Sequence, residues 1–246
     1  MKRLLAMFGF SLFSHVAQAA PQINVGVVYD YLDGDKSSYL KRIFNGGDST
    51  AFVKINILEI IYDADGNARE IPLVNQTDGT SRDGLMASPA RLIVPANGLQ
   101  GSRLLYLGAR EKERYFRVRF VPVVPEREDE FAISAEERDD YKKSLSAGVN
   151  VLAGYGTVFF VRPKETRFDS VSENEAGQYR IRNNGNSVVV IDEFKNCSIK
   201  SAHDCLPTTK HHILAGRTFQ FEKQPGRHYR FTMIEGSKSQ NLDIKG

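Results

Sequence analysis

Four histidines in the second half of the chain are the first residues to consider for chemistry, because imidazole binds metal ions and transfers protons near neutral pH. They are His203, His211, His212 and His228. Adjacent side chains on a β-strand point to opposite faces, so His211 and His212 cannot easily share one ion. No nucleophile with a placed base, nucleotide-binding fingerprint, P-loop or GxSxG elbow occurs in the sequence. We therefore expect exposed histidines without a function, no metal or cofactor, and a protein that is not an enzyme.

Cys197 and Cys205 are the two cysteines of the chain. An even pair in an exported protein is typical of a disulfide. We expect a structural bridge that pins two strand ends and contributes roughly 2–3 kcal/mol at most, because the loop it closes is short. A redox or metal pair is the alternative, but the spacing is not C-x-x-C and His203 alone does not complete a zinc site.

One apolar segment, residues 149–161, is thirteen residues long, whereas a strand usually has about five or six. It follows the charged residues 125–146, which have little periodic apolar content and predict a mobile connecting loop with one helical turn. A long apolar strand at a sheet edge invites self-association. It suits a protein that lends this edge to a partner by strand addition. The alternative is a buried central strand.

The rest of the chain is typical of an all-β protein. Residues 114–120 alternate strictly, with Phe116, Val118 and Phe120 predicted to face inward and Arg117 and Arg119 outward. Turn signals recur about every ten residues, which is typical of β-sandwiches. The length favours two of them, over residues 20–163 and 164–246, with the boundary at Pro163.

The first nineteen residues are typical of a secretory signal peptide. Lys2 and Arg3 precede an apolar run over residues 4–13, and Ala17-Gln18-Ala19 is a small-x-small cleavage site. A membrane anchor is the alternative, but the run is too short to span a bilayer. The leader is typical of a bacterial export signal, so we predict a periplasmic protein. Without Lys2 and Arg3, the 33 basic residues become 31 against 30 acidic ones, which argues against nucleic acid as a partner.

Residues 88–98 (SPARLIVPANG) and residues 113–120 (ERYFRVRF) are two motifs that can be compared with known families. They are similar to a proline-containing segment and to the "E-x-Y-R-V-x-F" strand of the periplasmic pilus chaperones of the chaperone–usher pathway, which have the PapD-like fold. The long strand that ends at Pro163, the turn over residues 183–186 and the cysteine pair follow in the family's order. The resemblance covers the mature chain and is closest to the alternate branch, which serves colonisation-factor-type and common-pilus-type fimbriae.

This resemblance implies two immunoglobulin-like β-sandwich domains in a boomerang arrangement. It implies that the chain completes pilus subunits that lack a strand and delivers them to an outer-membrane usher. The donor side chains would be Val149, Val151, Ala153 and Tyr155, at every second position. A second copy of the chain is a further expected partner, since it would cover the apolar edge when no subunit is bound.

The chain departs from the family at the residues that hold the subunit's terminal carboxylate. Counted from the family's landmarks, these positions fall near Tyr29, the cleft candidate, and at Val158, and neither is basic. Lys54 or Arg91 could instead reach the cleft. Arg162 matches an interdomain arginine of the family, and its expected acidic partner is Glu235.

A secreted two-domain adhesin or pilus subunit is the alternative function. A pilus subunit is usually one domain with a pairing segment near its start, whereas here the long strand lies mid-chain between two domain-sized halves. This arrangement favours the chaperone.

Overall fold

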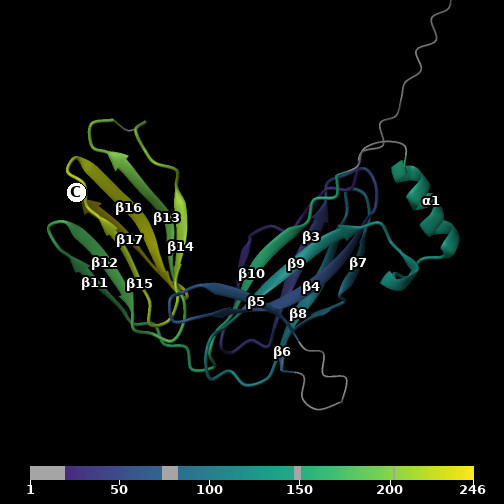
Figure 1. Cartoon of the computed structure of the whole chain (residues 1–246), viewed down its shortest axis with the longest axis horizontal. Coiled ribbons are helices and arrows are strands. Elements are labelled where there is room, and N and C mark those ends of the chain that lie inside the picture. Colours follow the sequence, from purple (N-terminus) through teal and green to yellow (C-terminus); the bar gives the residue numbers. More distant parts are fainter. Residues whose placement is uncertain (1–19, 74–82, 147–150, 202) are drawn as a thin grey trace, which may run out of the picture.

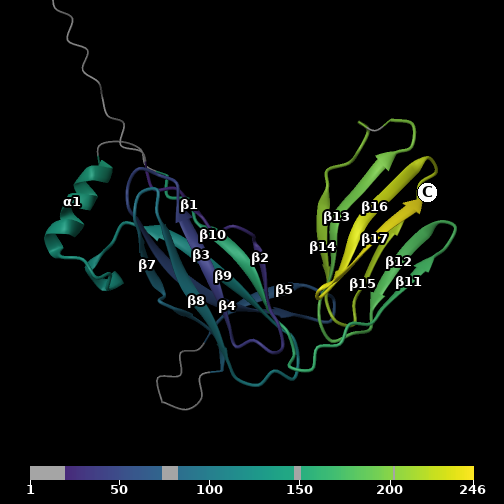
Figure 2. The same ribbon diagram turned by 180° about the vertical axis from the view of Figure 1, so that it is seen from behind.

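A computed structural model of the protein describes residues 20–73, 83–146, 151–201 and 203–246. The predicted signal peptide lies outside this part of the chain. Two β-sandwich lobes meet at an angle, as the two opposite views in Figures 1 and 2 show. This is the predicted all-β fold of two immunoglobulin-like domains in a boomerang arrangement.

The first lobe has two sheets. The first sheet has the order β1-β3-β8-β6, formed by Ile23–Asn24, Ser38–Asn45, Leu99–Leu107 and Gly84–Ser88. The second has the order β2-β10-β9-β4-β5, formed by Tyr29–Leu32, Tyr155–Val161, Arg114–Val123, Ala51–Tyr62 and Ala68–Pro72, and β7 (Arg91–Val94) also pairs with β4.

The core of the first lobe lies between these two sheets. Phe116, Val118 and Phe120 are fully buried in it, so the inward face predicted from strict alternation is confirmed. β10 adds Phe159 and Val161 to the same core. The Ser88–Pro89 peptide bond is cis.

The second lobe also has two sheets. The order β11-β12-β15 is formed by Ser170–Asn174, Gln178–Asn183 and Thr218–Glu222. The order β14-β13-β16-β17 is formed by Thr209–Ile213, Val189–Ser198, Arg227–Glu235 and Lys238–Lys245. No strand of one lobe pairs with a strand of the other in the described part of the chain. We propose that the domain boundary is at Pro163, between β10 and β11.

Two expectations for the middle of the chain were wrong. The strand predicted over residues 149–161 is the shorter β10, Tyr155–Val161, and residues 151–154 are not part of a strand. The segment predicted to be a mobile loop contains the 3-10 helix η1 (Arg127–Asp129) and the twelve-residue helix α1 (Ala135–Ser146). The sequence did not predict this helix because the segment has little periodic apolar content. A few aromatic contacts, described below, hold the helix on the first lobe. No helix in the described residues is long and apolar enough to cross a membrane.

The cysteine pair is a disulfide. Cys197 and Cys205 are bonded, with their Cα atoms 4.0 Å apart. Cys197 lies in β13, and Cys205 forms an isolated β-bridge with it ahead of β14. The bond therefore joins the end of β13 to the segment that leads into β14.

Candidate functional site

β10 is covered on one edge along its whole length and on the other edge along only part of it. It pairs antiparallel with β9 from Tyr155 to Val161, but parallel with β2 only from Val158 onward. In the described part of the chain, the backbone from Tyr155 to Thr157 therefore has no strand on its second side. Such an edge offers unpaired hydrogen-bonding groups to an incoming strand.

Gly26 lies between β1, which belongs to the first sheet, and β2, which belongs to the second. Its φ of +69° is a left-handed conformation that glycine adopts at little cost. The chain leaves the first sheet at β1 and enters the second at β2, where the Val28 carbonyl accepts a hydrogen bond from the Val158 amide at 2.8 Å. Val27 and Val28, which precede β2, are 64% and 44% exposed. Apolar side chains therefore flank the open half of β10.

Three of the four predicted donor side chains lie in the described residues, and all three are exposed. Val151 is 74% exposed, Tyr155 is 40% exposed, and Ala153 is also exposed. Val149 lies outside the described residues. The following residues at every second position, Thr157, Phe159 and Val161, are buried in the first lobe. The same row of β10 thus changes from exposed to buried near the point where β2 begins to pair.

Tyr29 and Val158 are register partners in the β2–β10 pair, so the two positions expected at the cleft are neighbours. Tyr29 is half-buried. Its ring centroid lies 4.3 Å from that of His212, which belongs to β14 of the second lobe. A side chain of the second domain therefore covers Tyr29.

Like His211 and His228, His212 is half-buried, so the expectation of exposed histidines was wrong for all three residues. Its Nε2 lies 2.8 Å from the Tyr31 hydroxyl, and its ring stacks on Phe160 with centroids 5.1 Å apart. Burial, together with nearby Lys210, lowers the pKa of His212 to about 4. The sequence showed the histidine but not its neighbours, because the aromatic partners come from strands more than fifty residues away.

His211 points the other way, as expected for adjacent residues on a strand. Its ring contacts Phe219 at 4.7 Å, on the side of the second lobe's own core. The two adjacent histidines therefore have separate surroundings. His228 pairs with Asp243 on the neighbouring strand β17.

Two arginines lie on the face of the second sheet that is turned toward the second lobe. Arg117 is opposite Val158, and Arg119 is opposite Gly156, so their side chains share a face with Phe160, which contacts His212. Both bind Glu70, at 2.8 Å and 2.5 Å, and Arg117 in particular lowers the pKa of Glu70. Their side chains are 30% and 50% exposed.

The other basic residues considered from the sequence are engaged elsewhere. Lys54 pairs with Asp129 at 2.6 Å, and Arg91 pairs with Glu130 at 3.2 Å. Both acidic partners belong to the connection between β9 and β10. Strict alternation had placed Arg117 and Arg119 outward, but it could not show that this side faces the second lobe.

The acidic partner of Arg162 is Asp33 and not Glu235. Arg162 binds Asp33 at 2.7 Å, and its guanidinium lies 5.2 Å from the ring of Tyr31 and 5.3 Å from that of Phe168. No ion pair joins it to Glu235 in the described residues, although Gly236 comes near: a Cβ at Gly236 would lie 3.7 Å from its Nη1. Arg162 thus bridges the two lobes through aromatic contacts.

Glu113 makes the most buried polar contact between the lobes. Its carboxylate accepts hydrogen bonds from the Ser187 hydroxyl at 2.6 Å and the Val188 amide at 2.8 Å, both in the second lobe. Burial raises the pKa of Glu113, and these two hydrogen bonds oppose the rise. The residue begins the 113–120 motif, but the contact could not be predicted from the sequence because its partners are more than seventy residues away.

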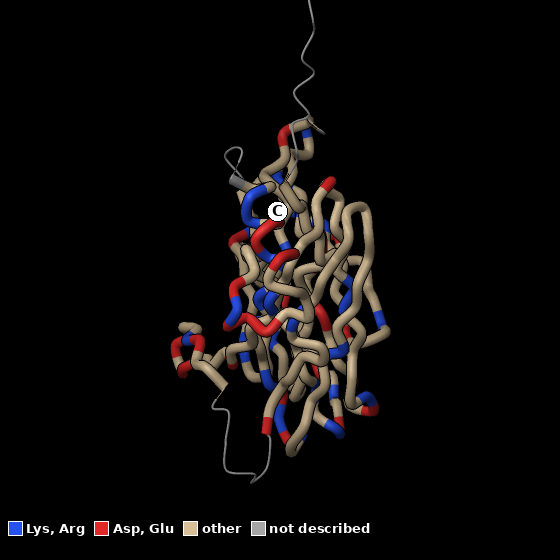
Figure 3. Tube along the Cα trace, turned by 90° about the vertical axis from the view of Figure 1, so that its right-hand side faces the viewer, with Lys and Arg blue, Asp and Glu red and all other residues tan. Residues whose placement is uncertain are grey.

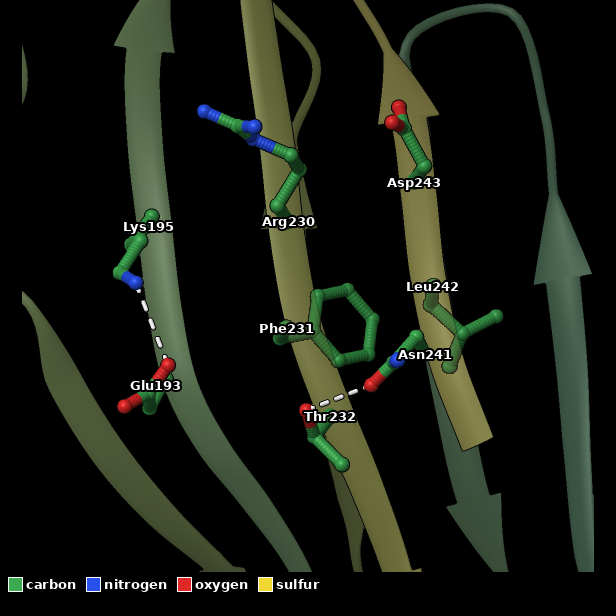
Figure 4. A pocket seen from close by; sticks show the side chains of 8 residues that line it. All are labelled: Glu193, Lys195, Arg230, Phe231, Thr232, Asn241, Leu242 and Asp243. Carbon is green, nitrogen blue, oxygen red and sulfur yellow. Dashed lines mark hydrogen bonds and ion pairs between the residues drawn. The ribbon is translucent and has the colours of Figure 1, made fainter. Parts of the chain in front are cut away.

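A shallow pocket lies on the sheet β14-β13-β16-β17 (Figure 4). Its polar side chains largely satisfy one another: Lys195 pairs with Glu193 at 3.2 Å, and Thr232 donates to Asn241 at 2.8 Å. Residues of both charge signs are interspersed along the described chain (Figure 3).

Comparison with known proteins identifies relatives of this two-lobed chain. No family model matches it. Over 213 residues, or 86% of each chain, it is 25% identical to the probable fimbrial chaperone EcpB of Escherichia coli O1:K1 / APEC and 26% identical to that of Escherichia coli K12 / DH10B. The chain is a relative of the fimbrial chaperones.

Solved structures support the fold of this fimbrial-chaperone relative. The class 5 fimbriae chaperone CfaA superposes with a TM-score of 0.55 at 20% identity, covering 92% of this chain and 99% of CfaA. The E. coli chaperone DraB gives a TM-score of 0.55 at 10% identity, with coverage of 93% and 100%. The resemblance to PapD-like chaperones, expected from the sequence, is confirmed. The relatives are named as chaperones, the class that the sequence favoured over an enzyme.

Proposed function

We propose that this protein is a periplasmic chaperone that binds, folds and caps pilus subunits by donor-strand complementation. The half-open edge of β10 carries this proposal. Backbone groups from Tyr155 to Thr157 are available for strand pairing, and Val151 and Tyr155 stand exposed beside them. A monomeric protein gains nothing from such an edge, whereas a subunit that lacks a strand would bury it.

The side chains define what the subunit's groove must accept. Full burial of Val151 in a partner would contribute roughly 1.5–3 kcal/mol. Ala153 has less apolar surface and calls for a shallow pocket. Tyr155 extends the row toward the body of the first lobe. The CsuC chaperone matches this fold with a TM-score of 0.52 at 13% identity, with coverage of 92% and 99%, and forms a pre-assembly complex with the CsuE tip adhesion subunit, which supports the proposal.

We also propose that Arg117 and Arg119 bind the terminal carboxylate of the subunit. His212 covers Tyr29, so the position next to Val158 is filled by the second lobe. The two arginines lie one strand farther on the same face and share a single carboxylate, Glu70. A second carboxylate would be held by charge-assisted hydrogen bonds there. Arg119→Ala is expected to weaken subunit binding about ten-fold, whereas Arg69→Ala, an exposed arginine on β5, is not; equal affinities of the two variants in a titration would contradict this assignment.

Delivery of the subunit to an outer-membrane usher completes the proposal. An usher must bind while the subunit is in place, so its docking surface must lie away from the open edge of β10. The first sheet offers one: Leu40, Phe44 and Leu99 are 44%, 42% and 55% exposed, and Phe44 and Leu99 are register partners. This sheet does not contain β10.

The experiment that tests the function is co-purification from the periplasm with the small secreted proteins encoded beside the chaperone. We expect a one-to-one complex that Val151→Asp abolishes, because a charge cannot enter an apolar pocket without a large desolvation penalty. Val171→Asp is the matched control, since Val171 is exposed on β11 of the second lobe. Loss of fimbriae in cells with Val151→Asp alone would extend the result to assembly.

Survival of the complex in Val151→Asp would show that the donor edge is wrongly assigned. Polymers in place of a one-to-one complex would favour the alternative, a pilus subunit. A folded protein that captures no secreted partner would favour an adhesin.

A further inference from the structure

The connection between β9 and β10 determines how freely the start of the donor edge can move. It spans residues 124–154, which is 31 residues, and includes η1 and α1. A flexible connection of this length would let its ends sample many positions, because loop-closure entropy grows with length. The described residues show instead that the connection is attached to the first lobe before β10 begins.

An aromatic cluster makes the attachment. Phe52, on β4, contacts the ring of Phe131 at 5.3 Å and that of Tyr141, on α1, at 4.8 Å, both edge to face. Phe52 and Phe131 are 5% and 6% exposed. Aromatic pairs in this geometry stabilise beyond the area that they bury. The helix is therefore packed on the sheet through Tyr141, although most of its surface is polar.

Polar contacts fix the same segment. The Tyr141 hydroxyl donates to the Thr50 carbonyl at 2.8 Å, and Lys54 binds Asp129 at 2.6 Å. Ser134 caps α1: its hydroxyl accepts from the Glu137 amide at 3.1 Å, while the Glu137 carboxylate accepts from the Ser134 amide at 2.7 Å. This reciprocal pair stabilises the first turn. The contacts at Asp129 and at Tyr141 thus hold the segment on the first lobe without involving β10.

The attachment lies at the end of the sheet where the donor edge starts. Phe52 is the register partner of Val123, the last residue of β9, and β10 begins opposite Phe120 of the same strand. Gly154, just before β10, also lies close to β9: a Cβ there would come within 3.0 Å of the Phe120 carbonyl oxygen. The helix anchor and the donor edge therefore share one end of β9.

We propose that α1 and the preceding turn are a brace that pre-organises the donor edge, with Phe131 and Tyr141 as its positioning residues. Counted from Tyr141, only residues 142–154, 13 in number, remain between the anchor and β10. A connection of 13 residues in place of 31 raises the local concentration of the donor edge at its docked position about four-fold. The proposal rests on the proposed function, since the benefit is faster and tighter binding of a subunit strand.

Two measurements on the full-length mature protein test the brace. In Tyr141→Ala, we expect hydrogen exchange of the β10 amides near Tyr155 to become at least several-fold faster, while exchange in β8 stays unchanged. We also expect association with a purified subunit to slow about four-fold. Tyr141→Phe keeps the ring on Phe52 and loses only the hydrogen bond to Thr50, so it should retain most of the wild-type behaviour.

Phe131→Ala and Asp129→Ala provide independent variants if Tyr141→Ala does not fold. Melting of α1 in any of them, seen as faster exchange within the helix, with unchanged exchange in β10 and unchanged association, would overturn the brace. If the wild type binds no subunit, the proposed function fails, and the exchange measurement on the free protein still decides whether the helix restrains β10.

Discussion

At the scale of single residues, the chemistry of this protein lies where the two lobes meet. His212 brings an imidazole from the second lobe onto three aromatic rings of the first, Tyr29, Tyr31 and Phe160. Burial disfavours the charged imidazolium there. The residue therefore serves packing between domains, and its ionisation opposes that packing.

The shift in the pKa of His212 makes the stability of the protein depend on pH. The unfolded chain binds the proton near pH 6.5, whereas the folded protein binds it only near pH 4. Between these values the unfolded state holds more protons, so the free energy of unfolding falls as the pH falls from about 6.5 to 4. We expect this group to account for roughly 1–2 kcal/mol, allowing for its partial exposure.

His212→Phe isolates this effect, because phenylalanine keeps the ring contacts and cannot be protonated. Urea unfolding at a series of pH values should show a smaller loss of stability between pH 6.5 and 4 in the variant than in the wild type. The result is read from the difference between the stability–pH curves of the variant and the wild type. Glu113, whose pKa is raised by burial, contributes to both curves with the opposite sign, so neither curve alone isolates His212. Parallel curves would show that His212 is not shielded from protons.

At the scale of secondary-structure elements, β10 has two roles divided along its length. From Val158 onward it is a central strand between β2 and β9, and before Val158 it is an edge. The buried central strand considered from the sequence therefore describes one part of β10 and an open edge the other, while the lending of that edge to a partner stays a prediction. The apolar composition of β10 could not show where the edge ends and the central strand begins, because this boundary is set by the residue at which β2 starts to pair.

The disulfide belongs to the same scale, because it joins the end of β13 to the approach of β14. Replacing both Cys197 and Cys205 by alanine should lower the free energy of unfolding of the second lobe by roughly 2–3 kcal/mol, the value expected for a closed loop of this length. Denaturant unfolding measures it, and reduction of the wild type should give a similar loss. Subunit binding should persist, since the donor edge lies in the first lobe; its loss would indicate that this hairpin also contacts the subunit.

At the scale of the whole molecule, a small set of contacts holds the angle between the lobes. Besides His212 and Arg162, the Arg217 guanidinium donates to the backbone carbonyls of Asp63 and Ala64, both at 2.5 Å. Glu113 adds the hydrogen bonds to Ser187 and Val188. The open side of the boomerang between the two lobes is visible in Figure 1. In the proposed function, subunit binding at β10 would depend on this angle only through the side chains, such as Arg117 and Arg119, that face the second lobe.

Glu113→Ala tests how strongly the lobes are coupled. It leaves the Ser187 hydroxyl and the Val188 amide without their partner in a buried contact, which costs roughly 1–3 kcal/mol. We expect a wider distribution of interdomain angles, seen in small-angle X-ray scattering as a larger radius of gyration. Glu113→Gln keeps the shape and one acceptor, so it should change the scattering less. Identical scattering of all three proteins would show that other contacts set the angle.

The fold class, the inward face of β9, the disulfide and the family resemblance could all be predicted from the sequence. These features depend on local periodicity, on residue pairs or on short motifs, all of which can be read along the chain. Val151, Ala153 and Tyr155 are likewise exposed as the donor row requires, and their role in binding stays a prediction.

The remaining features depend on the folded structure. It extended one predicted turn into α1, because the helix is held by Phe52 and not by an apolar face of its own. It placed His212 on Tyr29, paired Arg162 with Asp33, and turned Arg117 and Arg119 toward the second lobe. Each of these contacts joins residues far apart in the chain, and burial and electrostatic pairing depend on distance in space, which no local pattern records.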